Sequence, residues 1–187
     1  LLMFNIDLHR HDEFSSFDGY GEATKLAIIA KAKGLEALGV TNHGNTSSLV
    51  KHYFACKEQG IKPILGCEVY FQPVFDKNKP QFHLCLFAKN LKGYENLNKI
   101  QTEAIANFFY NPIVTFELLK KYSEGIICSS ACVGGFIPQL IAKGKNKLAV
   151  KAANKFKSIF GKDFYFEIQP YKLFDRPGLQ CWLIRIR

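Results

Sequence analysis

Short apolar runs alternate along the chain with longer segments of helical periodicity, and this alternation limits the fold more than any other feature. The pattern predicts strands at 3–8, 37–40, 61–71, 82–88, 125–128 and 164–169, and helices at 22–33, 45–59, 91–106, 116–122, 136–142 and 145–160. Strands and helices that alternate with short links favour an α/β fold built on a parallel sheet or a barrel. A length of 187 residues suits one domain with a sizeable core.

In folds of this kind, functional side chains gather where strands end and loops begin. The rule selects five residues of metal-ligand type, each late in a predicted strand or just after one: His9, His11, His43, Glu68 and Cys132. His83 falls near the start of its predicted strand, so the rule does not select it.

His9, His11 and His43 can each be interpreted either as a metal ligand or as an ordinary surface or hydrogen-bonded histidine. His9 and His11 are alternate residues of an extended segment and face the same way, so both imidazoles can reach one ion. The alternative is one surface histidine and one that is hydrogen-bonded. His43 lies in the turn Thr41–Gly44, where it is either a ligand or a loop histidine that hydrogen-bonds the turn.

Glu68 lies in an apolar strand, where a carboxylate is seldom buried without a partner or a metal. Its alternative is a position on the open, solvent side of the strand. Cys132 could bind a metal as a thiolate, although a core or helix-start cysteine is the commoner outcome. Asp18 follows the His9–His11 pair closely and strengthens the interpretation of these residues as ligands.

The net charge is +9, but the first 50 residues hold four basic and six acidic side chains together with three of the five histidines. This grouping favours metal ligands over a phosphate-binding face in the first quarter. Lys147, Lys151 and Lys155 share one face of a predicted helix and could contact DNA phosphates. A solvated helix face is the alternative.

The cysteine pattern and the absence of a signal sequence predict a reduced, cytoplasmic protein without a membrane segment. None of the six cysteines stands in a Cys-x-x-Cys pair, and we assign Cys56, Cys67, Cys85 and Cys128 to packing. His52 is predicted as a surface or packing residue of a helix. No phosphate-binding loop or serine-hydrolase elbow occurs in the sequence.

Several segments together resemble the PHP (polymerase and histidinol phosphatase) domain of bacterial and phage C-family replicative polymerases, the DNA polymerase III alpha subunits. They are Leu-His-Arg-His-Asp-Glu-Phe-Ser at 8–15, Thr-Asn-His-Gly-Asn at 41–45, Gly-Ile-Lys-Pro-Ile-Leu-Gly-Cys-Glu-Val-Tyr at 60–70, Phe-His-Leu at 82–84, Gly-Tyr-Glu-Asn-Leu at 93–97 and Phe-Tyr-Phe-Glu-Ile-Gln at 164–169. The resemblance covers roughly residues 4–180.

The resemblance implies a distorted (βα)7 barrel with two or three metal ions. It places seven residues on ligand positions: His9, His11, Asp18, His43, Glu68, His83 and Cys132. Among these, His9, His11, His43 and Glu68 are the expected catalytic residues. Imidazole, carboxylate and thiolate ligands together favour zinc, with manganese or iron as alternatives, whereas magnesium would serve the polymerase part.

Two features depart from the family pattern. Asn42 stands where most members have Asp, and the final Asp-x-His ligand pair is absent from the sequence. We therefore expect a PHP domain at 1–180, incomplete in its last strands, with an atypical tail at 181–187.

By resemblance, the chain is expected to be the N-terminal part of a DNA polymerase that replicates DNA. The metal centre would hydrolyse phosphodiester bonds in 3′–5′ proofreading, or would be a structural remnant of such a centre. DNA, a separate proofreading exonuclease and a sliding clamp are the expected partners. One alternative is a stand-alone PHP phosphatase that acts on a small phosphate ester, and another is a non-catalytic interaction module.

Overall fold

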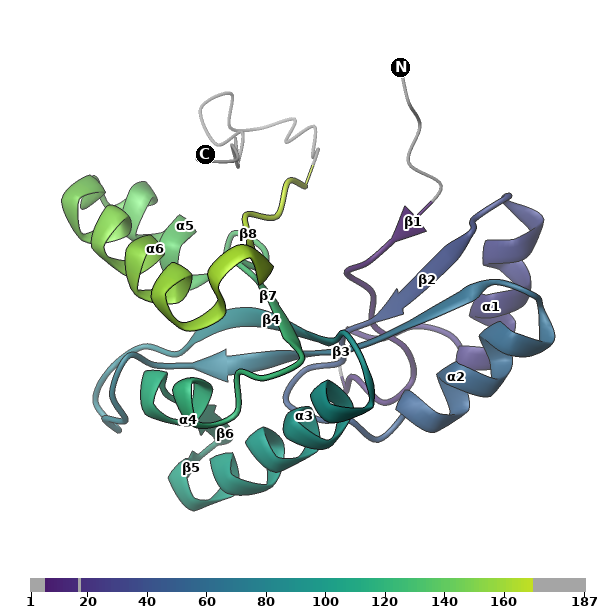
Figure 1. Cartoon of the computed structure of the whole chain (residues 1–187), viewed down its shortest axis with the longest axis horizontal. Coiled ribbons are helices and arrows are strands. Elements are labelled where there is room, and N and C mark those ends of the chain that lie inside the picture. The colour runs from purple at the N-terminus through teal and green to yellow at the C-terminus, as the bar shows by residue number, and fades with distance from the viewer. Residues whose placement is uncertain (1–5, 17, 170–187) are drawn as a thin grey trace.

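The computed structural model describes residues 6–16 and 18–169, and it confirms the α/β fold as a curled, half-barrel sheet with helices around it (Figure 1). The strands are β1 (Ile6–Asp7), β2 (Ala37–Val40), β3 (Lys62–Phe71), β4 (Phe82–Ala88), β5 (Phe108–Phe109), β6 (Asn111–Val114), β7 (Ile126–Ser129) and β8 (Phe164–Tyr165). The helices are α1 (Ala23–Ala32), α2 (Leu49–Glu58), α3 (Leu91–Ala104), α4 (Phe116–Lys121), α5 (Phe136–Ala142) and α6 (Asn146–Phe160). The predicted tail at 181–187 lies outside the described residues.

The sheet runs in the order β1-β2-β3-β4-β7-β8, and β3 is its longest member. The first half of β3 pairs in parallel with β2, and its second half pairs with β4 and β6. Helices α1 and α2 pack together beside β2 and the start of β3, whereas α5 and α6 lie at the other end of the sheet (Figure 1).

Along the order β1-β2-β3-β4-β7-β8, one strand departs from the parallel arrangement of the sheet: β4 runs antiparallel to both β3 and β7. A loop with no helix connects β3 to β4. Parallel neighbours need a long crossover, usually a helix, so this short return reverses the chain. As a result, the start of β4 lies beside the end of β3, and His83 pairs with Tyr70.

The β5–β6 hairpin was not predicted, because its strands are short and Pro112 interrupts the apolar run. Its turn places Tyr110 at a φ of 60°. β6 adds a parallel neighbour to the end of β3, through the pairs of Tyr70 with Ile113 and Phe71 with Val114.

The main core fills the space between the second half of β3, β4, β7 and the helices α3 and α6. Phe71, Phe156 and Leu97 are fully buried there, and the Phe71 and Phe156 rings lie 5.4 Å apart. Asn90 caps α3, because its side-chain oxygen accepts a hydrogen bond from the Gly93 amide at 2.9 Å. In the part of the chain that the structure describes, no helix is long and apolar enough to cross a membrane.

Candidate metal centre

Glu68 lies at the centre of a cluster of imidazoles although its side chain is only 1% exposed. Its Oε2 atom lies 3.1 Å from His9 Nε2, 3.1 Å from His11 Nε2 and 3.3 Å from His43 Nδ1. Its Oε1 atom lies 3.0 Å from His83 Nδ1. One buried carboxylate therefore faces four histidines, and the solvent-facing alternative for Glu68 does not hold.

Asp18 and Cys132 extend the cluster at its two ends. Asp18 Oδ2 lies 2.8 Å from His43 Nε2, and its Oδ1 lies 3.8 Å from His11 Nδ1. Cys132 Sγ lies 3.4 Å from His83 Nδ1. All seven residues predicted as ligands thus come together, including His83, because the antiparallel β4 returns its first residues to this edge of the sheet.

The turn after β2 brings His43 against β3. Gly44 has a φ of 61°, and its amide donates a 2.9 Å hydrogen bond to the Glu68 carbonyl. A Cβ atom at Gly44 would lie only 3.0 Å from the Tyr70 ring, which stacks on His43 with centroids 5.6 Å apart. Both the backbone angle and the close packing therefore require glycine next to His43.

Asn42 ties this turn to the loop that follows β1. Its Nδ2 donates to Asp12 Oδ1 at 2.6 Å and to Ser48 Oγ at 2.8 Å, and its Oδ1 accepts from the Asp12 amide at 2.9 Å. An aspartate at position 42 could not donate these bonds and would face the Asp12 carboxylate. Asn42 therefore joins Asp12 and Ser48 in a buried hydrogen-bond network beside His43.

Mutual contacts set the charges of the cluster. Burial alone would raise the pKa of Glu68, but hydrogen bonds from His11, His83 and His9 outweigh it and hold that pKa well below its usual range. Hydrogen bonds with Cys132 and Glu68 raise the pKa of His83 to about 10. The pKa of His43 is lowered, mainly by burial.

The donor set fits divalent metal ions. Four overlapping groups place ligand atoms within 4.8 Å of one another: His9, His11 and Glu68; His11, Asp18 and His43; His43, Glu68 and His83; and, at the edge of the cluster, His9, Cys85 and Glu167. His43 Nδ1 is buried without a hydrogen-bond partner among the described residues, which suits a nitrogen that binds an ion. Nitrogen, carboxylate and sulfur donors together are typical of zinc sites.

Other residues singled out by the sequence lie apart from this cluster. His52 is buried and donates to the Leu38 carbonyl at 2.9 Å, so it is a packing residue and not a surface residue. Lys147, Lys151 and Lys155 are exposed on α6, as the sequence pattern predicts. Within the described residues, no hydrogen bond or ion pair joins these lysines to the cluster, and their contact with DNA stays a prediction.

Three further residues touch His9. Glu167 Oε1 lies 2.5 Å from His9 Nδ1, Gln169 Nε2 lies 3.2 Å from the same nitrogen, and Cys85 Sγ lies 3.5 Å from it. Cys85 is buried as predicted, but its neighbour is a predicted ligand and not only the core. Sequence reasoning missed Glu167, although an acid within the run Phe164–Gln169 gives the same signal that selected Glu68.

Comparison with known sequences agrees with the resemblance. The PHP domain family matches residues 7–171. The DNA polymerase III alpha subunits of Borreliella burgdorferi and Aquifex aeolicus are 38% and 40% identical over 179 and 177 residues, which cover 91% and 88% of this chain. That of Helicobacter pylori is 39% identical and covers 96%. The chain spans about a sixth of the length of these relatives, at 16%, 15% and 16%.

Comparison with solved structures concerns the fold alone. An amidohydrolase from Chromobacterium violaceum, solved with bound SO4 and no metal, matches with a TM-score of 0.53 at 14% sequence identity. The match covers 87% of this chain and 85% of that one. Together with the family match over most of the sequence, the half-barrel sheet and its histidine cluster lead to one conclusion: the chain belongs to the PHP domain family.

Proposed function

We propose that the chain is the N-terminal PHP domain of a DNA polymerase III alpha subunit, and that its metal centre hydrolyses phosphodiester bonds of DNA in 3′–5′ proofreading. The observation that carries the hydrolytic part is the buried Glu68 carboxylate with four histidines around it. The similarity to alpha subunits of several bacteria supports the polymerase part.

The cluster would hold two or three divalent ions, with zinc preferred and manganese or iron as alternatives. Glu68 belongs to two of the four ligand groups and would be a ligand in both, while Asp18 and Cys132 would supply further ligands at the two ends of the cluster. When bound, such ions lower the pKa of a water molecule and neutralise charge on a phosphoryl oxygen.

The chain's own residues would orient this chemistry. Tyr70 stacks on His43 and meets the edge of His83, which fixes two imidazole planes on one side of Glu68. Ser15 Oγ lies 2.9 Å from His11 Nδ1 and fixes a third. Preorganised ligands hold ions in place without rearrangement of the site.

Polymerisation, with its magnesium ions, would belong to other parts of the parent polymerase. DNA is the proposed substrate, and a separate proofreading exonuclease and a sliding clamp are the proposed partners, in the cytoplasm. The exposed lysines 147, 151 and 155 are the proposed contacts with DNA phosphates.

The test is His11→Ala in the complete parent polymerase, with DNA that ends in a 3′ mismatch. We expect release of the 3′ nucleotide to fall about 100-fold, because His11 Nε2 faces the Glu68 carboxylate at the centre of the cluster. Nucleotide incorporation should stay unchanged, as should both activities of the exposed control Glu95→Ala.

Unchanged nuclease activity in His11→Ala would refute the hydrolytic centre. Hydrolysis of a small phosphate ester but not of DNA by the wild type would favour the phosphatase alternative. A wild-type protein that binds no metal and hydrolyses neither substrate would identify the domain as a non-catalytic module.

A further inference from the structure

We infer that Glu167 is a positioning residue of the metal centre, whose carboxylate fixes the His9 imidazole so that Nε2 faces the ions. The inference rests on the proposed function, because it assigns a role within that same centre.

The two ring nitrogens of His9 have separate tasks. Nε2 faces Glu68 Oε2 at 3.1 Å, inside the cluster. Nδ1 faces Glu167 Oε1 at 2.5 Å, on the opposite side of the ring. Both nitrogens face carboxylates, which can only accept hydrogen bonds. When an ion binds, Nε2 is the nitrogen inside the cluster that would give up its proton, and Nδ1 would keep its proton toward Glu167.

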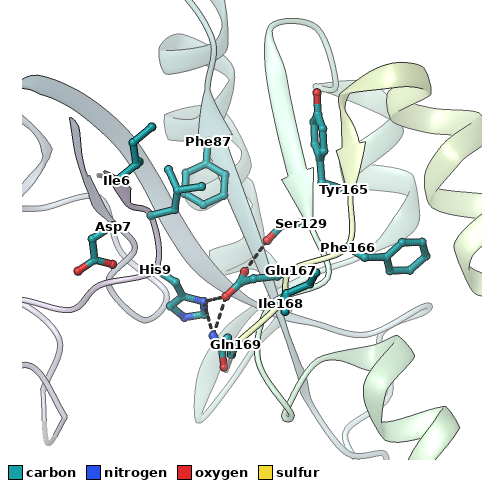
Figure 2. Close-up of a pocket in the computed structure, with 11 residues that line it drawn as sticks. Ile6, Asp7, His9, Phe87, Ser129, Tyr165, Phe166, Glu167, Ile168 and Gln169 are labelled. Atoms are coloured by element: carbon teal, nitrogen blue, oxygen red, sulfur yellow. Dashed lines mark hydrogen bonds and ion pairs between the residues drawn. The ribbon is translucent and has the colours of Figure 1, made fainter. Parts of the chain in front are cut away.

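Glu167 is itself held in place (Figure 2). Ser129 Oγ, at the end of β7, donates to Glu167 Oε2 at 2.7 Å, and Gln169 Nε2 donates to Oε1 at 2.6 Å. The Glu167 amide donates to Ser130 Oγ at 3.0 Å. A carboxylate that accepts two side-chain hydrogen bonds, on a backbone that is held by a third bond, can define the orientation of the ring that it contacts.

Direct ligation by Glu167 together with His9 Nδ1 does not fit the distance. Two ligand atoms about 2.0 Å from one tetrahedral ion lie about 3.3 Å apart. The nitrogen and the oxygen are only 2.5 Å apart, closer than the 2.8 to 3.8 Å between the histidine and carboxylate atoms of the predicted ligands, and this is the separation of a strong hydrogen bond.

The His9 ring has room to turn if Glu167 is lost. His9 and Glu167 both line a cavity of about 650 Å³ between β1 and β8 (Figure 2). The neighbouring imidazole of His11 is held differently, by the hydroxyl of Ser15 only four residues away. Of these two residues, His9 lies beside the cavity, and its Nδ1 is the one that is hydrogen-bonded to a carboxylate.

The experiment measures zinc bound by the 187-residue chain, by competition with a chromophoric chelator, in wild type, Glu167→Ala, Glu167→Gln and the exposed control Glu95→Ala. We expect Glu167→Ala to lower zinc affinity about 10- to 100-fold with the same number of ions. Glu167→Gln keeps an acceptor oxygen on a side chain of the same length, so its zinc affinity should fall less than that of Glu167→Ala. The control should match wild type.

Cobalt provides a readout that a purely structural role would not change. In the cobalt-loaded chain, the visible absorption bands of Glu167→Ala should shift, because a turned His9 alters the ligand geometry. The bands of Glu95→Ala should not move. If Glu167→Ala fails to fold, Glu167→Gln decides by the same two readouts.

Wild-type zinc affinity and an unshifted cobalt spectrum in the Glu167 variants would overturn this inference and leave the proposed function standing. Loss of one ion from both variants would also overturn it, since Glu167 would then be a ligand. A wild-type chain that binds no zinc would instead refute the proposed function, and this inference with it.

Discussion

Two buried histidine neighbourhoods of this chain use similar side chains and differ in one charge. His52, in α2, is 2% exposed, lies 3.5 Å from Cys56 Sγ and donates to the Leu38 carbonyl. His83, in β4, lies 3.4 Å from Cys132 Sγ and faces Glu68. Both pair an imidazole with a thiol at a similar distance.

The difference is the buried carboxylate. No carboxylate among the described residues forms a hydrogen bond or an ion pair with His52, and burial lowers its pKa. His83 has a pKa raised to about 10, because Cys132 and Glu68 accept hydrogen bonds from it. A contact between a histidine and a cysteine is therefore not enough to indicate a metal site. The buried Glu68 carboxylate distinguishes the candidate metal centre at His83 from the packing pair at His52.

The largest expected effect comes from removal of that acid. Glu68→Gln should abolish zinc binding, because it removes the carboxylate common to two ligand groups. His52→Gln, the matched change at the other buried histidine, should keep the full complement of ions. Elemental mass spectrometry of the purified chains measures both, and equal metal content in the two variants would contradict the comparison.

A smaller effect is expected from pH. The pKa values of His9 and His83 are raised, so both imidazoles carry their second proton and a positive charge at neutral pH in the metal-free chain. Zinc must displace these protons, and its affinity should rise about tenfold per pH unit for each proton released. Competition titrations at pH 6, 7 and 8 check this, and calorimetry in two buffers counts the protons. A flat profile would mean neutral histidines in the metal-free chain.

The smallest effect concerns the stability contributed by His52. Its folded pKa lies below the unfolded value of 6.5, so the unfolded chain takes up the proton first as the pH falls. The free energy of unfolding should therefore decrease below pH 6.5 in the wild type. His52→Gln should cost about 1 kcal/mol at pH 7 and decrease less steeply in acid. Urea unfolding with a chelator present measures both, and parallel acid profiles would contradict the assignment.

Much of the centre could be predicted because its residues interrupt apolar patterns. Glu68 lies in a buried strand, and His9 and His11 alternate at the end of another, so local sequence alone marks them. His83 escaped the strand-end rule, since strand direction depends on the return of the chain between β3 and β4. The direction of this return depends on tertiary structure, and the periodicity of the sequence does not predict it.

Glu167 and the β5–β6 hairpin show two further limits. The run Phe164–Gln169 is predicted as a strand, but only Phe164 and Tyr165 pair in the sheet. The importance of Glu167 comes from His9, 158 residues away in the sequence. The hairpin strands are too short to produce a periodic signal at all.

The contact between His9 and Glu167 also bears on how the sheet is closed. Within residues 6–16 and 18–169, β1 and β8 are the two edges of the curl, and each pairs with its neighbour through two residues. The side chains of His9 and Glu167 join the segments that follow these edges. Ions that bind the folded centre would stabilise it by mass action. The occupied centre would then hold β1 and β8 in place, and local unfolding of these two edge strands would depend on the free metal concentration around the protein.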